Sequence, residues 1–177
     1  ISNYHIVGLP RIGKSSLLKA FKTMIQENHY SHDLVVLYIS LDECDNSNDM
    51  WRIIGKGIRK ELKKQFHSSD KYTNFIDELD FEDVDENNID YEYVCSVARC
   101  MKASGFLGLI LIDEFDNFST IATKGTVGQV RTLFSGSEYG LRAVVASRRM
   151  VERIEKEVEG ALNSNVSILA STFVNGY

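Results

Sequence analysis

The stretch that most restricts the fold is residues 8–15, GLPRIGKS, because of what lies on either side of it. Residues 3–7 form a short apolar-rich run, which is typical of a buried strand. Residues 14–28 carry apolar side chains at helical spacing, which predicts an amphipathic helix. A strand that passes through a glycine-containing loop into a helix begins a βα unit. We therefore expect a sheet with helices packed against it.

The rest of the chain repeats this alternation. Nearly unbroken apolar runs predict buried strands, and apolar residues three or four positions apart predict helices. The expected strands are residues 3–7, 34–41, 107–112 and 141–146, and the expected helices are residues 14–28, 51–66, 70–79, 90–101 (with Asp90 as its cap), 127–134 and 149–158. Such alternation predicts an α/β fold in which a mainly parallel sheet lies between two layers of helices.

Residues 8–15 also have the composition of a loop that binds phosphate groups. Gly8 and Gly13 permit unusual backbone dihedrals, so that successive N–H groups can point at one anion, and the helix dipole adds to the attraction. Lys14 would reach the β- and γ-phosphates, and the Ser15 hydroxyl would ligate Mg²⁺. A glycine turn occurring by chance is the alternative, and the strand and helix around the loop argue against it. The predicted nucleotide-binding residues here are Gly8, Leu9, Pro10, Arg11, Ile12, Gly13, Lys14, Ser15 and Ser16.

A second group of polar residues ends the strand in residues 109–116, LILIDEFD. Ligands of open α/β sheets bind at the carboxyl ends of the strands, so Asp113 and Glu114 are expected beside the glycine loop. Asp113 would hold Mg²⁺, and Glu114 would accept a proton from an attacking water. Asp116 could support them through further hydrogen bonds, although an ordinary loop role is favoured. Solvation of a strand end is the alternative for the two carboxylates.

Residues 141–149, LRAVVASRR, place cations at the next strand end. A guanidinium binds a γ-phosphate well because it is planar, permanently charged and able to donate two parallel hydrogen bonds. We assign this role to Arg148 and leave Arg149 undecided. Either arginine could instead belong only to the first turn of the next helix, paired with a glutamate such as Glu152.

In this order, the three motifs resemble the additional-strand class of P-loop NTPases, which includes the AAA+, STAND and RecA-like groups. GLPRIGKSSL, LIDEFDNF and AVVASRRMVERIE are most similar to the NTPase domain of bacterial STAND proteins. The resemblance implies ATP or ADP and Mg²⁺ as cofactors and contact of Arg148 with the γ-phosphate. It also places the final strand and a helical lid beyond Tyr177, and it leaves Tyr4 and His5 as candidates for the adenine pocket. We expect the Walker A and Walker B strands to be neighbours in the sheet.

Length and composition suit one soluble domain of 177 residues, and the first residue, Ile1, suggests a fragment. The net charge of −5 argues against a surface devoted to nucleic acid. Unpaired cysteine spacing and the absence of a signal peptide predict a cytoplasmic protein, and no apolar run is long enough to cross a membrane. Residues 67–92 are expected to form an acidic surface insertion.

The sequence therefore predicts an ATP-hydrolysing switch domain of a STAND-like signalling or defence protein, which self-associates through the full-length protein. The alternative is an AAA+-type ATPase that acts on nucleic acid, supported by the basic residues of the 51–66 helix but not favoured, because a solvated helix face explains them as well. A small-molecule kinase and a domain locked by ADP are two further hypotheses.

Overall fold

The computed structural model describes residues 2–27, 33–66, 85, 88–159 and 174–175. The strands are β1 (Tyr4–Val7), β2 (Leu34–Ser40), β3 (Leu107–Asp113), β4 (Leu141–Ser147) and β5 (Val174–Asn175). The helices are α1 (Lys14–Glu27), α2 (Ser47–Phe66), α4 (Tyr91–Ala103), α5 (Phe118–Ile121), α6 (Lys124–Ser135) and α7 (Val151–Glu159), with the 3-10 turns η1 (Leu41–Glu43) and η3 (Phe115–Asn117).

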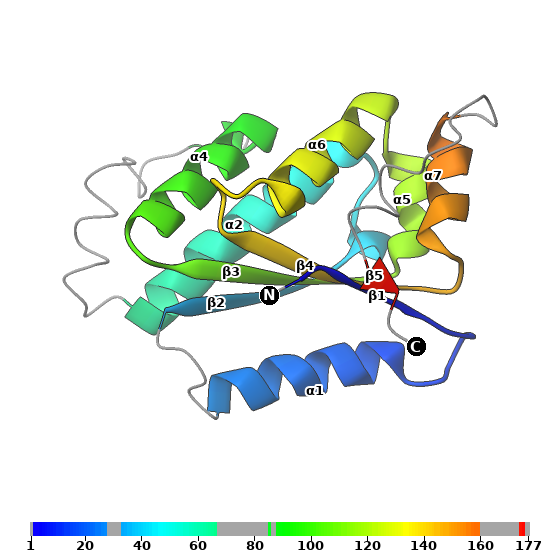
Figure 1. The fold of residues 1–177 in the computed structure, drawn as a ribbon, viewed down its shortest axis with the longest axis horizontal. Coiled ribbons are helices and arrows are strands. Elements are labelled where there is room, and N and C mark those ends of the chain that lie inside the picture. The colour runs from blue at the N-terminus through cyan, green and yellow to red at the C-terminus, as the bar shows by residue number, and fades with distance from the viewer. Residues whose placement is uncertain (1, 28–32, 67–84, 86–87, 160–173, 176–177) are drawn as a thin grey trace.

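The strands form one sheet in the order β2-β3-β4-β1-β5, and every pairing in it is parallel. Helix α1 covers one face of the sheet, whereas α2, α4 and α6 cover the other, with α5 and α7 at the end where β3 and β4 terminate (Figure 1). The predicted α/β fold, a mainly parallel sheet between two helical layers, is confirmed.

The unbroken apolar strands follow from this layering, because both faces of the sheet are buried. In β2, Val35 and Leu37 belong to the core that includes Trp51 of α2. Val36, between them, belongs to the core that includes Leu18 of α1. Successive side chains of a strand point to opposite faces, so a strand covered on both sides needs apolar residues at every position.

The expected adjacency of the Walker A and Walker B strands is wrong. The P-loop follows β1 and the acidic pair follows β3, and β4 lies between these two strands, pairing Val144 with Tyr4 and Arg142 with Leu109. All three strands are similarly apolar, so their sequences do not fix which strand pairs with which. As a consequence, the end of β4 lies between the glycine loop and the acidic pair.

The expected position of the last strand is also wrong, because β5 lies before Tyr177. Its Val174 and Asn175 pair with Tyr4 and His5 of β1, so β5 is the strand beside the P-loop strand on its outer side.

Helix α2 begins four residues earlier than expected because the Asn46 side chain accepts hydrogen bonds from the backbone N–H groups of Asn48 and Asp49, as a helix cap does. Asp90 caps α4 as predicted, accepting from the backbone N–H of Tyr93.

Most of the predicted acidic insertion, residues 67–92, lies outside the described residues, as does the expected helix at residues 70–79. Tyr91 and Glu92, its last two residues, open α4. Within the described part of the chain, no helix is both long and apolar enough to span a membrane.

Candidate functional site

The glycine loop runs from the end of β1 into the first turn of α1. Its start is fixed by a hydrogen bond of 3.1 Å from the Gly8 N–H to the Ser147 carbonyl at the end of β4. Arg11 and Gly13 have positive φ angles of 64° and 94°. A β-carbon at Gly13 would meet no atom within 4 Å, so glycine is required there for its backbone conformation and not for space.

Lys14 holds its ammonium group over this loop. Its Nζ donates to the carbonyl oxygens of Gly8 at 2.8 Å and Leu9 at 3.1 Å. The side chains of Leu9 and Ile12 point into solvent, with 74% and 61% of their surface exposed. These two residues therefore contribute their backbone to the loop, whereas Lys14 contributes its side chain.

A pocket of about 520 Å³ lies against the loop and brings together residues from three separate strand ends. Its lining consists of Pro10, Arg11, Gly13, Lys14, Ser15, Ser16, Glu114 and Arg148. Of the predicted site residues, Gly8, Leu9, Ile12 and Asp113 do not line it. The basic groups of Arg11, Lys14 and Arg148 give the pocket the charge that a polyphosphate requires.

Asp113 is buried at the end of β3, where 3% of its surface is exposed. Its carboxylate accepts a hydrogen bond of 2.8 Å from the Tyr38 hydroxyl of the neighbouring strand and one of 2.9 Å from the Glu114 N–H. Burial of Tyr38, followed by its bond to Asp113, raises the pKa of this phenol above its ordinary value. Tyr38 was not predicted, because only the pairing of β2 with β3 reveals its proximity to Asp113.

The donors available for Mg²⁺ are the Ser15 hydroxyl and the Asp113 carboxylate. Hard oxygen donors of this kind hold Mg²⁺ together with substrate phosphates, and a cage made of protein alone is not required. The described residues contain no cluster of three or more histidine, cysteine or acidic side chains that could hold a metal ion without other ligands.

Glu114 adopts a left-handed backbone conformation, with φ 49° and ψ 43°. Non-glycine residues rarely adopt it, and such strain often accompanies function. The turn directs its carboxylate to the Arg148 guanidinium, where Oε2 and Nη2 lie 3.0 Å apart. Both groups line the pocket and are partly exposed, so each is accessible to a ligand.

The two arginines after β4 have different surroundings. Arg149 donates to the Asp116 carboxylate from Nε at 2.9 Å, to the Asp116 carbonyl from Nη2 at 2.9 Å and to the Ser119 hydroxyl at 3.3 Å, and its Nη1 pairs with Glu157. All three nitrogens of the Arg149 guanidinium therefore contact protein groups, and the role of Arg149 is to hold these segments together. Arg148 is instead more than half exposed.

Asp116 connects β4 to β3. Its Oδ2 accepts the backbone N–H of Arg148 at 2.6 Å, and its Oδ1 accepts from Arg149. Burial would raise the pKa of Asp116, but the bonds from Arg149 and Arg148 outweigh it, and the pKa lies below its ordinary value. The sequence favoured a plain loop role for Asp116, and the structure gives it these partners instead.

The end of β4 is fixed from β1 as well. The Ser147 hydroxyl donates to the Arg149 carbonyl at 2.5 Å and lies 2.6 Å from Nε2 of His5. Because the hydroxyl proton is used, His5 donates from Nε2. His5 is fully buried, which does not fit its expected place in an adenine pocket, whereas Tyr4 is exposed.

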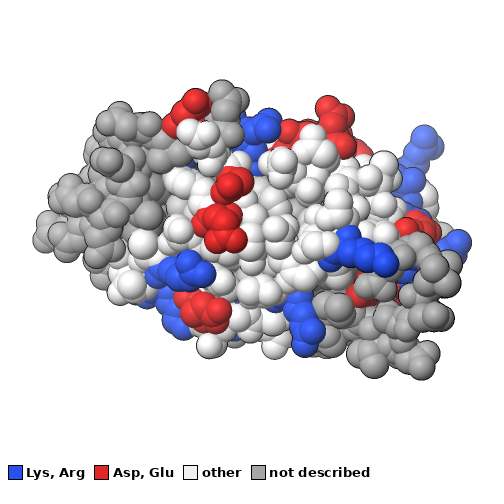
Figure 2. All heavy atoms as spheres, turned by 90° about the horizontal axis from the view of Figure 1, so that it is seen from above, with Lys and Arg blue, Asp and Glu red and all other residues white. Residues whose placement is uncertain are grey.

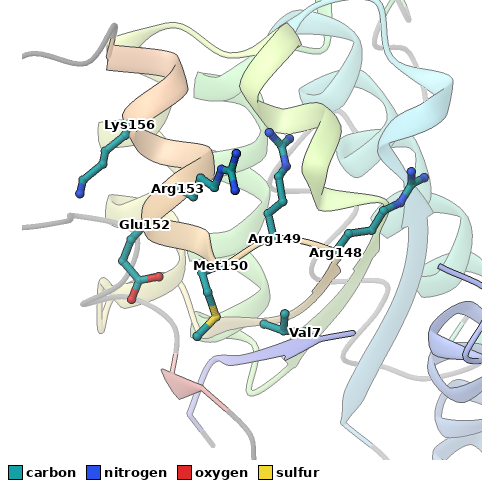
Figure 3. Close-up of a pocket in the computed structure, with 7 residues that line it drawn as sticks. All are labelled: Val7, Arg148, Arg149, Met150, Glu152, Arg153 and Lys156. Atoms are coloured by element: carbon teal, nitrogen blue, oxygen red, sulfur yellow. The ribbon is translucent and has the colours of Figure 1, made fainter. Parts of the chain in front are cut away.

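A second pocket, of about 490 Å³, lies beside the first and shares Arg148 with it (Figure 3). Val7 and Met150 form its apolar side, and Arg153 and Lys156 belong to α7. In Figure 3 the side chains of Arg148 and Arg149 leave the end of β4 in different directions, in agreement with their separate partners. Arg148 is thus accessible from two sides.

No protein-family model matches the chain, and no curated protein matches it. Among solved structures, ORC2 of Aeropyrum pernix in ADPNP–ADP complexes matches with a TM-score of 0.52 and 12% identity, covering 98% of this chain and 40% of that one. The ADP form of the same protein gives 0.50 and 13% over the same shares. ORC1 of Aeropyrum pernix in complex with DNA gives 0.49 and 11%, over 89% of this chain and 37% of that one.

The parallel sheet and the glycine loop at its strand edge give the chain the three-layer α/β fold of the P-loop NTPases. At these identities the likeness shows the fold alone. These structural neighbours are ORC proteins, so they do not single out the STAND branch suggested by the motifs. The chain spans about 40% of the length of the ORC2 protein.

Proposed function

We propose that this chain binds ATP together with Mg²⁺ and hydrolyses it. The observation that carries the proposal is the pocket whose lining joins Lys14 and Ser15 of the glycine loop to Glu114 and Arg148. Phosphoryl transfer requires mainly positioning and charge stabilisation, and these four residues offer an ammonium, a hydroxyl, a carboxylate and a guanidinium in one cavity.

The loop N–H groups and Lys14 bind the phosphates, and Ser15 and Asp113 hold Mg²⁺, which neutralises developing charge when bound. Arg148 binds the γ-phosphate. Its present partner is Glu114, 3.0 Å away, so a γ-phosphate competes with Glu114 for the guanidinium. Once Arg148 is engaged by phosphate, the Glu114 carboxylate can accept the proton of the attacking water.

Nucleotide binding by wild type and Lys14→Ala tests the first part. Loss of hydrogen bonds from a charged group costs about 1.5–3 kcal/mol, or roughly 10- to 150-fold in affinity. Lys124→Ala, which removes an exposed lysine of α6, is the matched control and should bind as wild type does. Equal ATP affinity in wild type and Lys14→Ala would refute nucleotide binding at this loop.

Product analysis tests the second part. Release of inorganic phosphate from ATP without an added acceptor supports hydrolysis and counts against a small-molecule kinase. A chain that retains ADP and releases no phosphate would fit the locked domain instead.

We further propose that ATP hydrolysis drives a conformational switch of the kind found in the AAA+/STAND group. The ATP and ADP states of the protein would then differ in domain arrangement or self-association. The fold likeness to ORC2 supports the AAA+ side of this group. Sedimentation of the full-length protein with ADP and with a non-hydrolysable ATP analogue tests the switch, and identical sedimentation in both states would count against it.

Action on nucleic acid is a second candidate function, supported by one helix. On α2, Lys60, Lys63 and Lys64 are exposed, while Glu61 is buried and paired with Lys22 at 2.6 Å. The outer side of the end of α2 is therefore basic. On the face shown in Figure 2, Lys and Arg are scattered among Asp and Glu, so that face offers no continuous basic surface.

Stimulation of the ATPase by DNA tests this function, and the stimulation should fall steeply with salt. Replacing Lys60, Lys63 and Lys64 by glutamine should abolish it and leave the basal rate unchanged. Insensitivity of the wild type to DNA would exclude the nucleic-acid role and would leave the proposed hydrolysis intact.

A further inference from the structure

We infer that Asp116 and Arg149 form a clamp that positions Arg148 for the γ-phosphate. The inference rests on the proposed function, since it concerns how one residue of the ATP site acquires its place. In this arrangement Arg148 contacts the nucleotide, and Asp116 and Arg149 act through it as positioning residues.

The first support is the bonding of the Asp116 carboxylate. Each of its two oxygens accepts from a different consecutive residue: Oδ2 from the Arg148 backbone at 2.6 Å and Oδ1 from the Arg149 side chain at 2.9 Å. The backbone of Arg148 is thus held to η3, the turn that follows Glu114. One carboxylate therefore fixes the distance between the segment carrying Glu114 and the segment carrying Arg148.

The second support is the tight packing of the residues around Asp116. Its neighbours Phe115 and Phe118 are fully buried and stack on each other with ring centroids 4.9 Å apart. Asp116 itself is buried at 9% exposure. Side chains locked by packing hold a functional group more precisely than a solvated loop does.

The third support is the contrast between the two guanidinium groups. Arg149 uses Nε and both terminal nitrogens on Asp116, Ser119 and Glu157, in the part of the chain that joins η3, α5 and α7. Arg148 leaves the end of β4 in another direction (Figure 3) and lines the pocket that also contains Lys14. The two adjacent arginines thus have different roles: Arg149 fixes the end of the strand, and Arg148 faces the ligand.

The geometry dictates the test variants. Asp116→Asn has only one acceptor oxygen for two donors, and its NH₂ group would face an N–H. Arg149→Lys keeps the charge but cannot reach both the Asp116 carboxylate and its carbonyl. Arg153→Lys is the matched control, because Arg153 also pairs with Glu157 but is highly exposed and, within the described residues, makes no hydrogen bond with Asp116.

The measurements are kcat, KM and the affinities for ATP and ADP. Arg148→Ala should lower kcat by roughly 10²–10³-fold, as loss of one preorganised donor does. Asp116→Asn and Arg149→Lys should lower kcat by about ten- to a hundredfold through misplacement. Both should reduce the preference for ATP over ADP and leave ADP affinity unchanged, whereas Arg153→Lys should match wild type.

A double-mutant cycle separates positioning from independent action. In the Arg148→Ala background, Asp116→Asn should change kcat by less than about twofold, because the residue through which it acts is already gone. Full additivity of the two losses would overturn the inference, as would an equal loss of ATP and ADP affinity in Arg149→Lys. If Arg148→Ala itself hydrolyses ATP as wild type does, the assigned role of Arg148 fails and the clamp fails with it. If the wild type does not bind ATP, the proposed function fails first.

Discussion

Replacement of Asp116 by asparagine should destabilise the fold in a way that depends on pH. The carboxylate accepts bonds from Arg148 and Arg149, and 11% of the Asp116 side chain and 29% of the Arg149 side chain are exposed. Hydrogen bonds of charged groups contribute about 1.5–3 kcal/mol, and breaking a buried ion pair costs about 3–5 kcal/mol. Because Arg149 is partly solvated, we expect a loss of about 2–3 kcal/mol at pH 7.

For a chain of this size, 1 kcal/mol corresponds to about 2–4 °C, so Tm should fall by about 4–12 °C. The folded-state pKa of Asp116 lies below its ordinary value, so its stabilisation is complete above the unfolded pKa near about 4 and is lost as pH falls through the folded value. The difference in free energy of unfolding between wild type and variant should therefore shrink below about pH 4.

Urea unfolding at a series of pH values measures this difference. Asp90→Asn is a suitable control, because asparagine caps a helix about as well as aspartate, and it should be nearly neutral. A difference between wild type and Asp116→Asn that stays constant down to pH 3 would refute the argument that the ionised carboxylate is the stabilising species. A variant as stable as wild type at pH 7 would refute the clamp as a stabilising contact.

Three further predictions concern other parts of the site. Tyr38→Phe removes a donor to the buried Asp113 and should lower stability by about 1.5–3 kcal/mol in urea unfolding; an unchanged midpoint would show that water replaces the hydroxyl. Gly13→Ala should lower the free energy of unfolding by about 1–2 kcal/mol because Gly13 has a φ of 94°. Gly128 lies in helix α6 with no atom near the added carbon, so Gly128→Ala should raise the free energy of unfolding by up to about 1 kcal/mol. Equal effects of the two variants in calorimetry would contradict the conformational argument. Glu114→Gln should reduce the rate of phosphate release by about 10²–10⁴-fold with ATP binding retained, and an unchanged rate would show that Glu114 is not the base.

The sequence predicts the layers well because its periodicity reports burial directly. A strand such as β2, with Val35, Val36 and Leu37 in succession, is buried on both faces, and the alternation with helices then gives a parallel sheet. The convergence of Lys14, Glu114 and Arg148 could also be anticipated, because the carboxyl ends of parallel strands share one edge.

What the sequence does not supply is the lateral order of the strands and the partners that depend on it. Nothing in the residues of β1, β3 or β4 distinguishes a central neighbour from a distant one, so the place of β4 between the other two was not predicted. The bond from Tyr38 to Asp113 and the separation of Arg148 from Arg149 both depend on strand and turn positions that only the folded chain defines.

The central place of β4 has a consequence for how the chain folds. The Asn3 side chain, just before β1, accepts a hydrogen bond from the N–H of Ala143 in β4, 140 residues away. The strand that carries the P-loop therefore has no neighbour on that side until β4 exists, and closing so long a loop is slow. During synthesis the first of these five strands to emerge is among the last to be paired, and a chain stopped before residue 141 would contain β2 and β3 but no strand beside β1 to hold the glycine loop.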